Sequence, residues 1–446
     1  MKKAAVILLA GAQLLIVAGV WLRAHICHET GNLLVGGAPD QLLAWARLTG
    51  LLAALAILFQ FALLGRVRWV ERSFGMDRLT RLHHVAGFAL VFLLLAHPVL
   101  ATFGHAMQAD VGYWAQSADF IKSWQGLLSA NAGWLFMLAA GVTSALVLSA
   151  RLSYQRWYAT HLVLYVAFGL TIPHQVAVGG DLAEHGGFRL YWCLLYLCVA
   201  GAFLAYRFGA PLAALARHRF FVDKVVAEAG DVTSVHIGGN HLDAFRAEAG
   251  QFLIVRFLAK GFRWEAHPFS LSRPPDGHGL RLSIKRLGDF TRRIPELSPG
   301  TPVLIEGPYG VFTAKACRTQ RALLIAGGIG ITPIRSLAET LVQTGHDVLL
   351  IYANRDSATM VFKNELEELA SRSSGRLTLT PVMSGDPAWT GEKGRVDRTL
   401  LARRVPDLSS RDVFLCGPPP MMKGVREALA GLGIPARRIH DERFAL

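Results

Sequence analysis

Residues 82–104 of this 446-residue chain read LHHVAGFALVFLLLAHPVLATFG, an apolar run in which His83 and His97 stand 14 residues apart. A run of about 20 apolar residues is long enough to cross the hydrocarbon core of a bilayer as a helix. At 3.6 residues per turn, a spacing of 14 returns to the same helix face after about 21 Å of rise. The run therefore predicts a membrane helix with one histidine near each side of the hydrocarbon core.

Five more apolar segments of similar length surround this run. They are predicted at 4–22, 42–64, 131–149, 158–178 and 189–206. Arginines gather in the links after the second, fourth and sixth segments, whereas the other links are poor in Lys and Arg. Because positive loops stay in the cytoplasm, six spans place both termini there, in a multi-pass protein of the cell (inner) membrane whose direct partner is the lipid bilayer. The same pattern accounts for the net charge of +14 without a nucleic-acid partner.

The first segment also resembles a secretory signal peptide, because Met-Lys-Lys precedes its apolar residues. Its apolar run is long for a signal peptide, and no clear small-x-small cleavage site precedes His25. We therefore expect the first segment to be retained as a membrane helix.

The fifth segment carries a second histidine pair, His161 and His174. The third and fifth segments run in the same direction, so His83 is expected opposite His161, and His97 opposite His174. Neutral imidazoles are good axial ligands of haem iron, and four histidines at matching depth predict two b-type haems. The 13-residue spacing turns His174 off the face of His161 in an ideal helix, unless Pro173 rewinds the helix. Alternatively, these histidines bond neighbouring helices, or His84 replaces His83 as the ligand.

The chain beyond Arg207 has the charge distribution of a soluble protein, and Phe221–Gly310 alternates short strand-like runs with turns. This pattern predicts a small antiparallel β-barrel. Ser270 can bond a flavin ring edge, Lys285 supplies a cation, and the turn at Gly288–Thr291 offers backbone N–H groups to a pyrophosphate. The predicted FAD-binding residues are His267, Pro268, Phe269, Ser270, Lys285, Gly288, Asp289, Phe290, Thr291 and Gly307.

From Arg321 the pattern changes to alternating strands and helices, which predicts an α/β nucleotide-binding domain. A glycine-rich turn follows its first strand, although the turn is not the GxGxxG fingerprint. Cys416 ends a later strand, where ligands bind in such sheets, or is simply a packed thiol. Arg355 is either a phosphate ligand or a surface arginine. The predicted nicotinamide-nucleotide residues are Gly327, Gly328, Gly330, Thr332, Pro333, Arg355, Cys416, Gly417 and Pro418.

With these motifs, the whole chain resembles the NADPH oxidase and ferric reductase superfamily. The resemblance implies a six-helix haem domain at 1–208, an FAD-binding β-barrel domain at 217–317 and an NAD(P)-binding α/β domain at 320–446. It also implies that Phe444 covers the flavin ring and that Arg47 lies near the outer haem where oxygen reacts. Arg47, Cys416 and Phe444 are thus the expected catalytic residues. Ala101 stands where an additional histidine would follow His97 by one turn, which departs from an animal-type oxygen site.

The function implied is oxidation of cytosolic NADPH or NADH, with electrons passing through FAD and two haems to an outer acceptor. Oxygen, giving superoxide, is the leading expectation, and a ferric or cupric chelate is the alternative. A protein of another class would instead deliver electrons to a periplasmic protein partner. In that case the aromatic residues of 105–130, such as Trp114, would form a docking surface rather than an interfacial belt.

Overall fold

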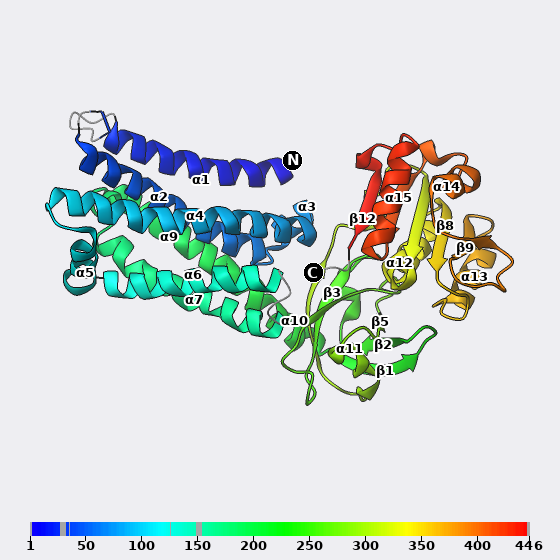
Figure 1. Cartoon of the computed structure of the whole chain (residues 1–446). Helices are drawn as coiled ribbons and strands as arrows, with labels where there is room; N and C mark the ends of the chain where they lie inside the picture. Colours follow the sequence, from blue (N-terminus) through cyan, green and yellow to red (C-terminus); the bar gives the residue numbers. More distant parts are fainter. Residues whose placement is uncertain (1, 27–32, 35, 125, 149–153, 444–446) are drawn as a thin grey trace. The chain divides into compact units, whose positions relative to one another are not determined.

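The computed structural model describes residues 2–26, 33–34, 36–124, 126–148 and 154–443 (Figure 1). The chain divides into two compact units by its internal contacts. The first unit comprises Met1–Val70 and Arg78–Tyr206, and the second comprises Glu71–Asp77 and Arg207–Leu446.

The first unit is helical, with a helix at each of the six predicted segments. Its long helices are α1 (Lys2–His25), α2 (Ala38–Leu64), α4 (Met76–Gln108), α6 (Leu127–Leu148), α7 (Tyr154–Ala177) and α9 (Gly186–Leu204). Shorter helices are α3 (Arg68–Phe74), which spans the boundary between the units, α5 (Tyr113–Ser123) and α8 (Gly180–Glu184). Among the described residues, five helices are long and apolar enough to cross a membrane, namely α1, α2, α4, α6 and α9. The helix α7 is not among them, because His161, Pro173 and His174 lower its mean hydropathy, and the sixth span stays a prediction.

Large apolar side chains point outward over much of this unit. Leu15 is 75 % exposed, Phe92 is 74 % exposed and Val166 is 60 % exposed, as expected for helices that contact lipid rather than water. Small residues let the helices approach one another closely. A Cβ atom on Gly133 of α6 would lie 2.5 Å from the carbonyl oxygen of Ala167 in α7, so this helix pair depends on the glycine.

The second unit begins with two three-stranded antiparallel sheets. One has the order β1 (Phe221–Ala227), β2 (Val232–Gly238), β5 (Leu280–Lys285), and the other has the order β4 (His267–Ser270), β3 (Phe252–Phe257), β6 (Val303–Tyr309). Isolated bridges connect Phe221 with Pro302 and Leu271 with Leu282, and the two sheets share one apolar core. The antiparallel pairing agrees with the prediction, whereas the strands form two bridged sheets rather than one closed ladder. The helices α10 (Ala210–His218) and α11 (Asp289–Arg292) complete this part.

A six-stranded parallel sheet follows. Its order is β10 (Glu392–Lys393), β9 (Leu377–Met383), β8 (Asp347–Asn354), β7 (Arg321–Gly327), β11 (Asp412–Cys416), β12 (Ile439–Glu442). Its helices are α12 (Ile331–Gln343), α13 (Lys363–Arg372), α14 (Arg398–Arg404) and α15 (Pro419–Gly431). Leu324 of β7 packs in a core with α12 and α13, whereas Leu323 and Ile325 pack in a core with α14 and α15. Strands buried on both faces are typical of doubly wound α/β domains. The strand order reverses at β7, where such sheets bind their ligands.

The segment Glu71–Asp77 lies within the range predicted for the haem domain but packs with the second unit. Glu71 is 1 % exposed, and its Oε1 accepts a hydrogen bond of 2.8 Å from the backbone N–H of Gly310. A buried carboxylate needs such a donor, which explains why this turn belongs with the flavin-binding strands.

Candidate functional site

Two histidine pairs connect α4 with α7 in the first unit. The ring centroids of His83 and His161 lie 6.1 Å apart, and those of His97 and His174 lie 6.3 Å apart. The helix α7 continues through Pro173, and the 13-residue spacing still brings each ring opposite its partner. The four histidines predicted from sequence therefore lie in the two pairs expected, with His84 beside His83 at 6.0 Å.

These separations suit one metal ion between each pair of rings. An imidazole nitrogen binds a transition metal at about 2 Å and lies about 1 Å from its own ring centroid, so two rings on opposite sides of one ion have centroids about 6 Å apart. Within the described residues, no group of three or more His, Cys, Asp or Glu side chains could hold a metal ion. Two facing imidazoles supply two ligands to such an ion, and a porphyrin would supply the remaining ligands of haem iron.

The hydrogen bonding of His97, alone among the four paired rings, orients the ring for a metal. Nδ1 of His97 lies 2.8 Å from the carbonyl oxygen of Ala46 in α2, so Nδ1 carries the proton and Nε2 is left as the ligand nitrogen. Nδ1 of His83, His161 and His174 is buried without a hydrogen-bond partner among the described residues. At the other pair, Nε2 of Gln60 donates to the carbonyl oxygen of His83 at 3.1 Å and fixes α4 against α2.

Two glycines leave room for the pair formed by His97 and His174. A Cβ on Gly50 would lie 2.8 Å from Cε1 and Nδ1 of His97, and a Cβ on Gly126 would lie 2.9 Å from the backbone nitrogen of His174. Gly126 also has a φ of +77°, which disfavours other residues. Neither glycine stood out in the sequence, because its role depends on the helix across from it.

We expect Gly50→Ala to displace the His97 ring, because a methyl group at 2.8 Å overlaps the ring and side chains of the helix pair leave little room. A haem bound between His97 and His174 would be lost in part, or its absorption and electron paramagnetic resonance signals would shift. Gly169→Ala in α7 is the matched control, since nothing lies within 4 Å of its added Cβ. Identical spectra for wild type and Gly50→Ala would contradict this placement of His97.

Arg47 lies one residue beyond the partner of His97, at the same end of α2. Its guanidinium is 4.0 Å from Oδ1 of Asp181, which is itself 3.9 Å from Nε2 of His25. Asp181 and His25 are buried, whereas the Arg47 side chain is 38 % exposed. The sequence-predicted cation thus has a buried carboxylate as its neighbour, and only the structure brings these residues of α1, α2 and α8 together.

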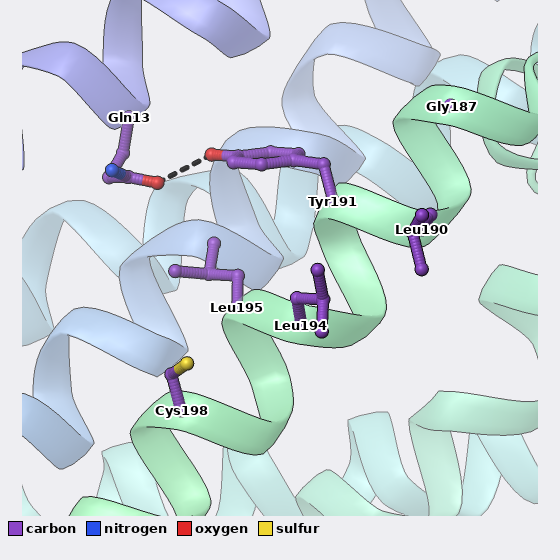
Figure 2. Close-up of a pocket in the computed structure, with 7 residues that line it drawn as sticks. All are labelled: Gln13, Gly187, Leu190, Tyr191, Leu194, Leu195 and Cys198. Atoms are coloured by element: carbon purple, nitrogen blue, oxygen red, sulfur yellow. Dashed lines mark hydrogen bonds between the residues drawn. The ribbon is translucent and has the colours of Figure 1, made fainter.

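A separate apolar pocket of about 400 Å³ lies between α1 and α9. Figure 2 shows the Tyr191 hydroxyl donating to Oε1 of Gln13 across this pocket, at 2.5 Å. None of the four paired histidines lines it. The hydrogen bond joins the first helix to the bundle and does not belong to the histidine site.

In the second unit, the predicted flavin residues gather around β4 and α11. The His267 ring lies 4.1 Å from the Phe290 ring, which brings the end of β4 against α11. The hydroxyl of Ser270 is buried without a hydrogen-bond partner among the described residues. An orphaned buried hydroxyl is costly unless a ligand satisfies it, so Ser270 fits a flavin ring edge.

The turn before α11 is already fixed by Thr291. Its Oγ1 accepts the backbone N–H groups of Leu287 and Gly288, both at 2.9 Å. These two donors are therefore used within the chain. Thr291 fixes the shape of the turn, and the N–H groups of Leu287 and Gly288 are not left for a pyrophosphate. Lys285 ends β5, and Gly307 lies in β6 with a φ of +124°.

Two glycine turns meet at the carboxyl ends of β7 and β11. A Cβ on Gly330 would lie 2.3 Å from the carbonyl oxygen of Cys416, and a Cβ on Gly417 would lie 3.2 Å from Cα of Gly327. Thr332 is buried, and its hydroxyl donates to the carbonyl oxygen of Ile329 at 3.0 Å. The predicted nucleotide residues are thus brought together at the reversal of strand order.

Two further predicted residues are Arg355 and Phe444. Arg355 follows β8 and is exposed, with its Cγ 3.2 Å from the position of a Cβ on Gly385. Phe444, the expected cover of the flavin ring, lies outside the described residues.

Glu442 is a site residue that the sequence analysis missed. Its strand β12 pairs in parallel with β11, and the register places Glu442 directly beside Cys416. Cys416 is fully buried and Glu442 is 8 % exposed. Burial, with the nearby carboxylates of Asp77 and Glu71, raises the pKa of Glu442 well above its usual value, and burial raises the pKa of the Cys416 thiol. Both groups therefore hold protons at the strand ends where a nucleotide would bind.

We expect Glu442→Gln to be more stable than wild type at neutral pH, with the difference disappearing at acid pH. A carboxyl whose folded pKa is raised stays protonated while the unfolded chain ionises, so wild-type stability falls as pH rises above about 4.3, by up to about 1.4 kcal/mol per pH unit until the folded pKa is reached. Thermal unfolding of the purified protein between pH 4 and pH 8 would measure the difference. The exposed Glu427 of α15 supplies the control variant, Glu427→Gln. A constant difference across this range would contradict a raised pKa.

Three families of known proteins match successive parts of the chain. Residues 49–172 match the family described as "Ferric reductase like transmembrane component", residues 219–313 match "FAD-binding domain", and residues 324–427 match "Oxidoreductase NAD-binding domain". The first range contains His83, His97 and His161, and His174 lies two residues beyond it.

Individual relatives match about half of the chain. The glycine betaine monooxygenase reductase subunit of Pseudomonas aeruginosa is 29% identical over 51% of the chain and 64% of its own length. The ferredoxin reductase component of 3-ketosteroid-9-alpha-monooxygenase from Mycobacterium tuberculosis is 34% identical over 45% of the chain and 55% of its own length. A solved structure, the Amycolatopsis cytochrome P450 reductase GcoB, matches 51% of this chain and 69% of its own, with 26% identity and a TM-score of 0.46. The chain thus spans less than two thirds of the length of these curated relatives, and it is similar to these reductases over about half of its own length.

Proposed function

With a ferric-reductase-like transmembrane component followed by FAD- and NAD-binding domains, the chain belongs to the NADPH oxidase and ferric reductase superfamily, and we propose that it passes electrons from cytosolic NADPH or NADH to oxygen on the outer face of the cell membrane. The matched domains indicate a membrane oxidoreductase that uses a nicotinamide nucleotide and FAD. We further propose that the chain binds two haems, that oxygen is the acceptor, and that both termini lie in the cytoplasm.

The observation that carries the proposal is the pair of facing histidines at each end of α4 and α7. Ring centroids 6.1 and 6.3 Å apart suit one bis-histidine iron each. When bound, FAD would supply the conversion of a two-electron donor into single electrons, and haem would supply one-electron carriers within the membrane. Different residues of the chain form the nucleotide-binding end and the acceptor end of this electron path.

On the cytoplasmic side, the residues of the second unit bind and orient. Ser270 offers its unpaired hydroxyl to the flavin. The turn at Gly327–Gly330 allows the nucleotide to approach the strand ends at Gly328, where nothing lies within 4 Å of an added Cβ, whereas the Met421 side chain packs against Gly327 and Gly417. Cys416 and Glu442 lie side by side at the same strand ends and exclude water from that side of the site.

At the outer end, Arg47 is the residue placed to meet the acceptor. Its half-exposed guanidinium would attract an anionic product such as superoxide. Asp181 lies 4.0 Å away and offsets part of this charge. A ferric chelate is the second candidate acceptor, and the match of residues 49–172 to a ferric-reductase-like component favours it. Delivery of electrons to a periplasmic protein is the third.

Purified protein loaded with FAD and haem would be assayed with NADPH and NADH for superoxide production and, separately, for Fe(III)-chelate reduction without oxygen. We expect NADPH-dependent oxygen consumption with superoxide release in the absence of added iron. Fe(III) reduction without superoxide would replace oxygen by a metal acceptor. No turnover with either acceptor, despite reduced haem, would favour a protein partner.

A further inference from the structure

The FAD-binding strands and the nucleotide-binding helices are joined by a buried cluster of charges. Arg281 of β5 donates to both carboxylate oxygens of Glu365 in α13, at 2.8 and 3.0 Å. Arg335 of α12 lies 2.9 Å from the same carboxylate. Arg281 is 7 % exposed and Arg335 is 8 % exposed, so one carboxylate holds two buried guanidinium groups that come from the two parts of the unit.

Both arginines also hold the backbone just beyond Ser270. The carbonyl oxygen of Ser272 accepts hydrogen bonds from Nη2 of Arg281 and Nη1 of Arg335, each at 3.1 Å. Ser272 itself is fully buried. The cluster therefore ties α12, the helix that starts at the glycine turn, to the segment that carries the flavin-facing hydroxyl.

The Phe362 ring completes the cluster. The guanidinium carbon of Arg281 lies 4.6 Å from the ring centroid, and that of Arg335 lies 6.0 Å from it. Phe362 precedes α13 with a φ of +60°, a strained value for a non-glycine residue. Although burial opposes it, the two guanidinium groups keep the pKa of Glu365 below its usual value. Nη1 of Arg335 also donates to Oε2 of Glu339 in the same helix, at 2.9 Å. Two buried cations that share Glu365, one of them also held by Glu339, form a rigid joint rather than an adaptable surface.

We propose that Arg281, Arg335 and Glu365 are positioning residues that fix the nucleotide-binding part at the distance required for hydride transfer to the flavin. The inference rests on the proposed function. The transfer moves two electrons and one proton together from the reduced nicotinamide ring to the flavin, and water supplies the second proton. A misplacement of about 1 Å lowers the rate of such a step by up to about a hundredfold.

The test compares Glu365→Gln with Glu368→Gln in the full-length, FAD- and haem-loaded protein. Glu368 lies on the same helix in an exposed pair with Arg372, so the control removes a carboxylate of α13 without touching the joint. Anaerobic stopped-flow would measure flavin reduction at saturating NADPH and with NADPH deuterated at the transferred position. Hydrogen exchange would follow the amides of 270–285 and 363–372.

For Glu365→Gln we expect flavin reduction to be roughly tenfold to a hundredfold slower, with a larger isotope effect, faster exchange in both segments and little change in nucleotide affinity. Glu368→Gln would match wild type. Unchanged flavin reduction, or a loss explained entirely by weaker nucleotide binding, would overturn the proposal. If Glu365→Gln fails to fold, Glu365→Asp keeps the charge but shortens the reach, and wild-type rates in that variant despite faster exchange would overturn it equally. Wild-type flavin that no nicotinamide nucleotide reduces would refute the proposed function, while the exchange data would still test the joint.

Discussion

His97→Ala is expected to reduce the haem content from two per chain to one and to abolish reduction of the outer acceptor. His97 faces His174 at 6.3 Å, and its Nδ1 is held by the carbonyl oxygen of Ala46, so its removal leaves His174 without the facing ring. Loss of a residue that only hydrogen-bonds to a metal ligand lowers metal affinity about 10- to 100-fold, and loss of the ligand itself lowers the affinity further. Haem content by pyridine haemochrome and superoxide release by purified protein measure the two effects.

The same variant separates the two halves of the chain. Reduction of a soluble dye by the flavin takes place in the second unit and is expected to keep its wild-type rate. His84→Ala is the control, because His84 neighbours His83 on α4 but belongs to neither facing pair. Two haems in His97→Ala, or a haem lost in His84→Ala, would contradict the assignment. Equal loss of dye reduction and superoxide release would contradict the division into two modules.

Gly330→Ala is expected to abolish most of the flavin reduction by NADPH while leaving haem and FAD bound. The added methyl group would lie 2.3 Å from the carbonyl oxygen of Cys416. Both groups are backbone-fixed at the ends of paired strands, so the clash is relieved only by separating the turns. Such overpacking costs about 1–3 kcal/mol, equivalent to about fivefold to 150-fold in the equilibrium that presents the nucleotide site.

Stopped-flow flavin reduction over a range of NADPH concentrations would measure this loss. Gly424→Ala is the control, because nothing lies within 4 Å of its added Cβ, and alanine is favoured over glycine within the helix α15. A Gly330→Ala protein with wild-type flavin reduction would show that the two turns do not form the nucleotide site.

The residues that could be predicted from sequence are those whose signal lies in one local pattern. His83 and His97 share a helix face by their spacing, and Gly327–Gly330 follows a strand, so each could be assigned before the fold was known. In α7 two signals conflict. His161 and His174 indicate the site, but as polar residues they lower the hydropathy by which a membrane span is recognised. In an ideal helix, the 13-residue spacing turns His174 away from the face of His161. In the structure, the rings of His97 and His174 nevertheless face each other.

The residues that were missed act through partners distant in the chain. Glu442 becomes a site residue only through the parallel register with Cys416. Gly50 matters only because the His97 ring lies across from it, and Glu71 only because Gly310 donates to it. The cluster of Arg281, Arg335 and Glu365 likewise joins three elements whose spacing in the sequence carries no pattern.

The central claim is that one chain takes electrons from a nicotinamide nucleotide and delivers them to two haems held between α4 and α7. Anaerobic titration of the purified protein with NADPH, followed by the visible spectrum of flavin and haem together, tests this claim most directly. We expect the purified protein to contain two b-type haems per chain, both reduced by NADPH through the bound FAD. Fewer than two haems per chain, or flavin that is reduced while the haems stay oxidised, would contradict it.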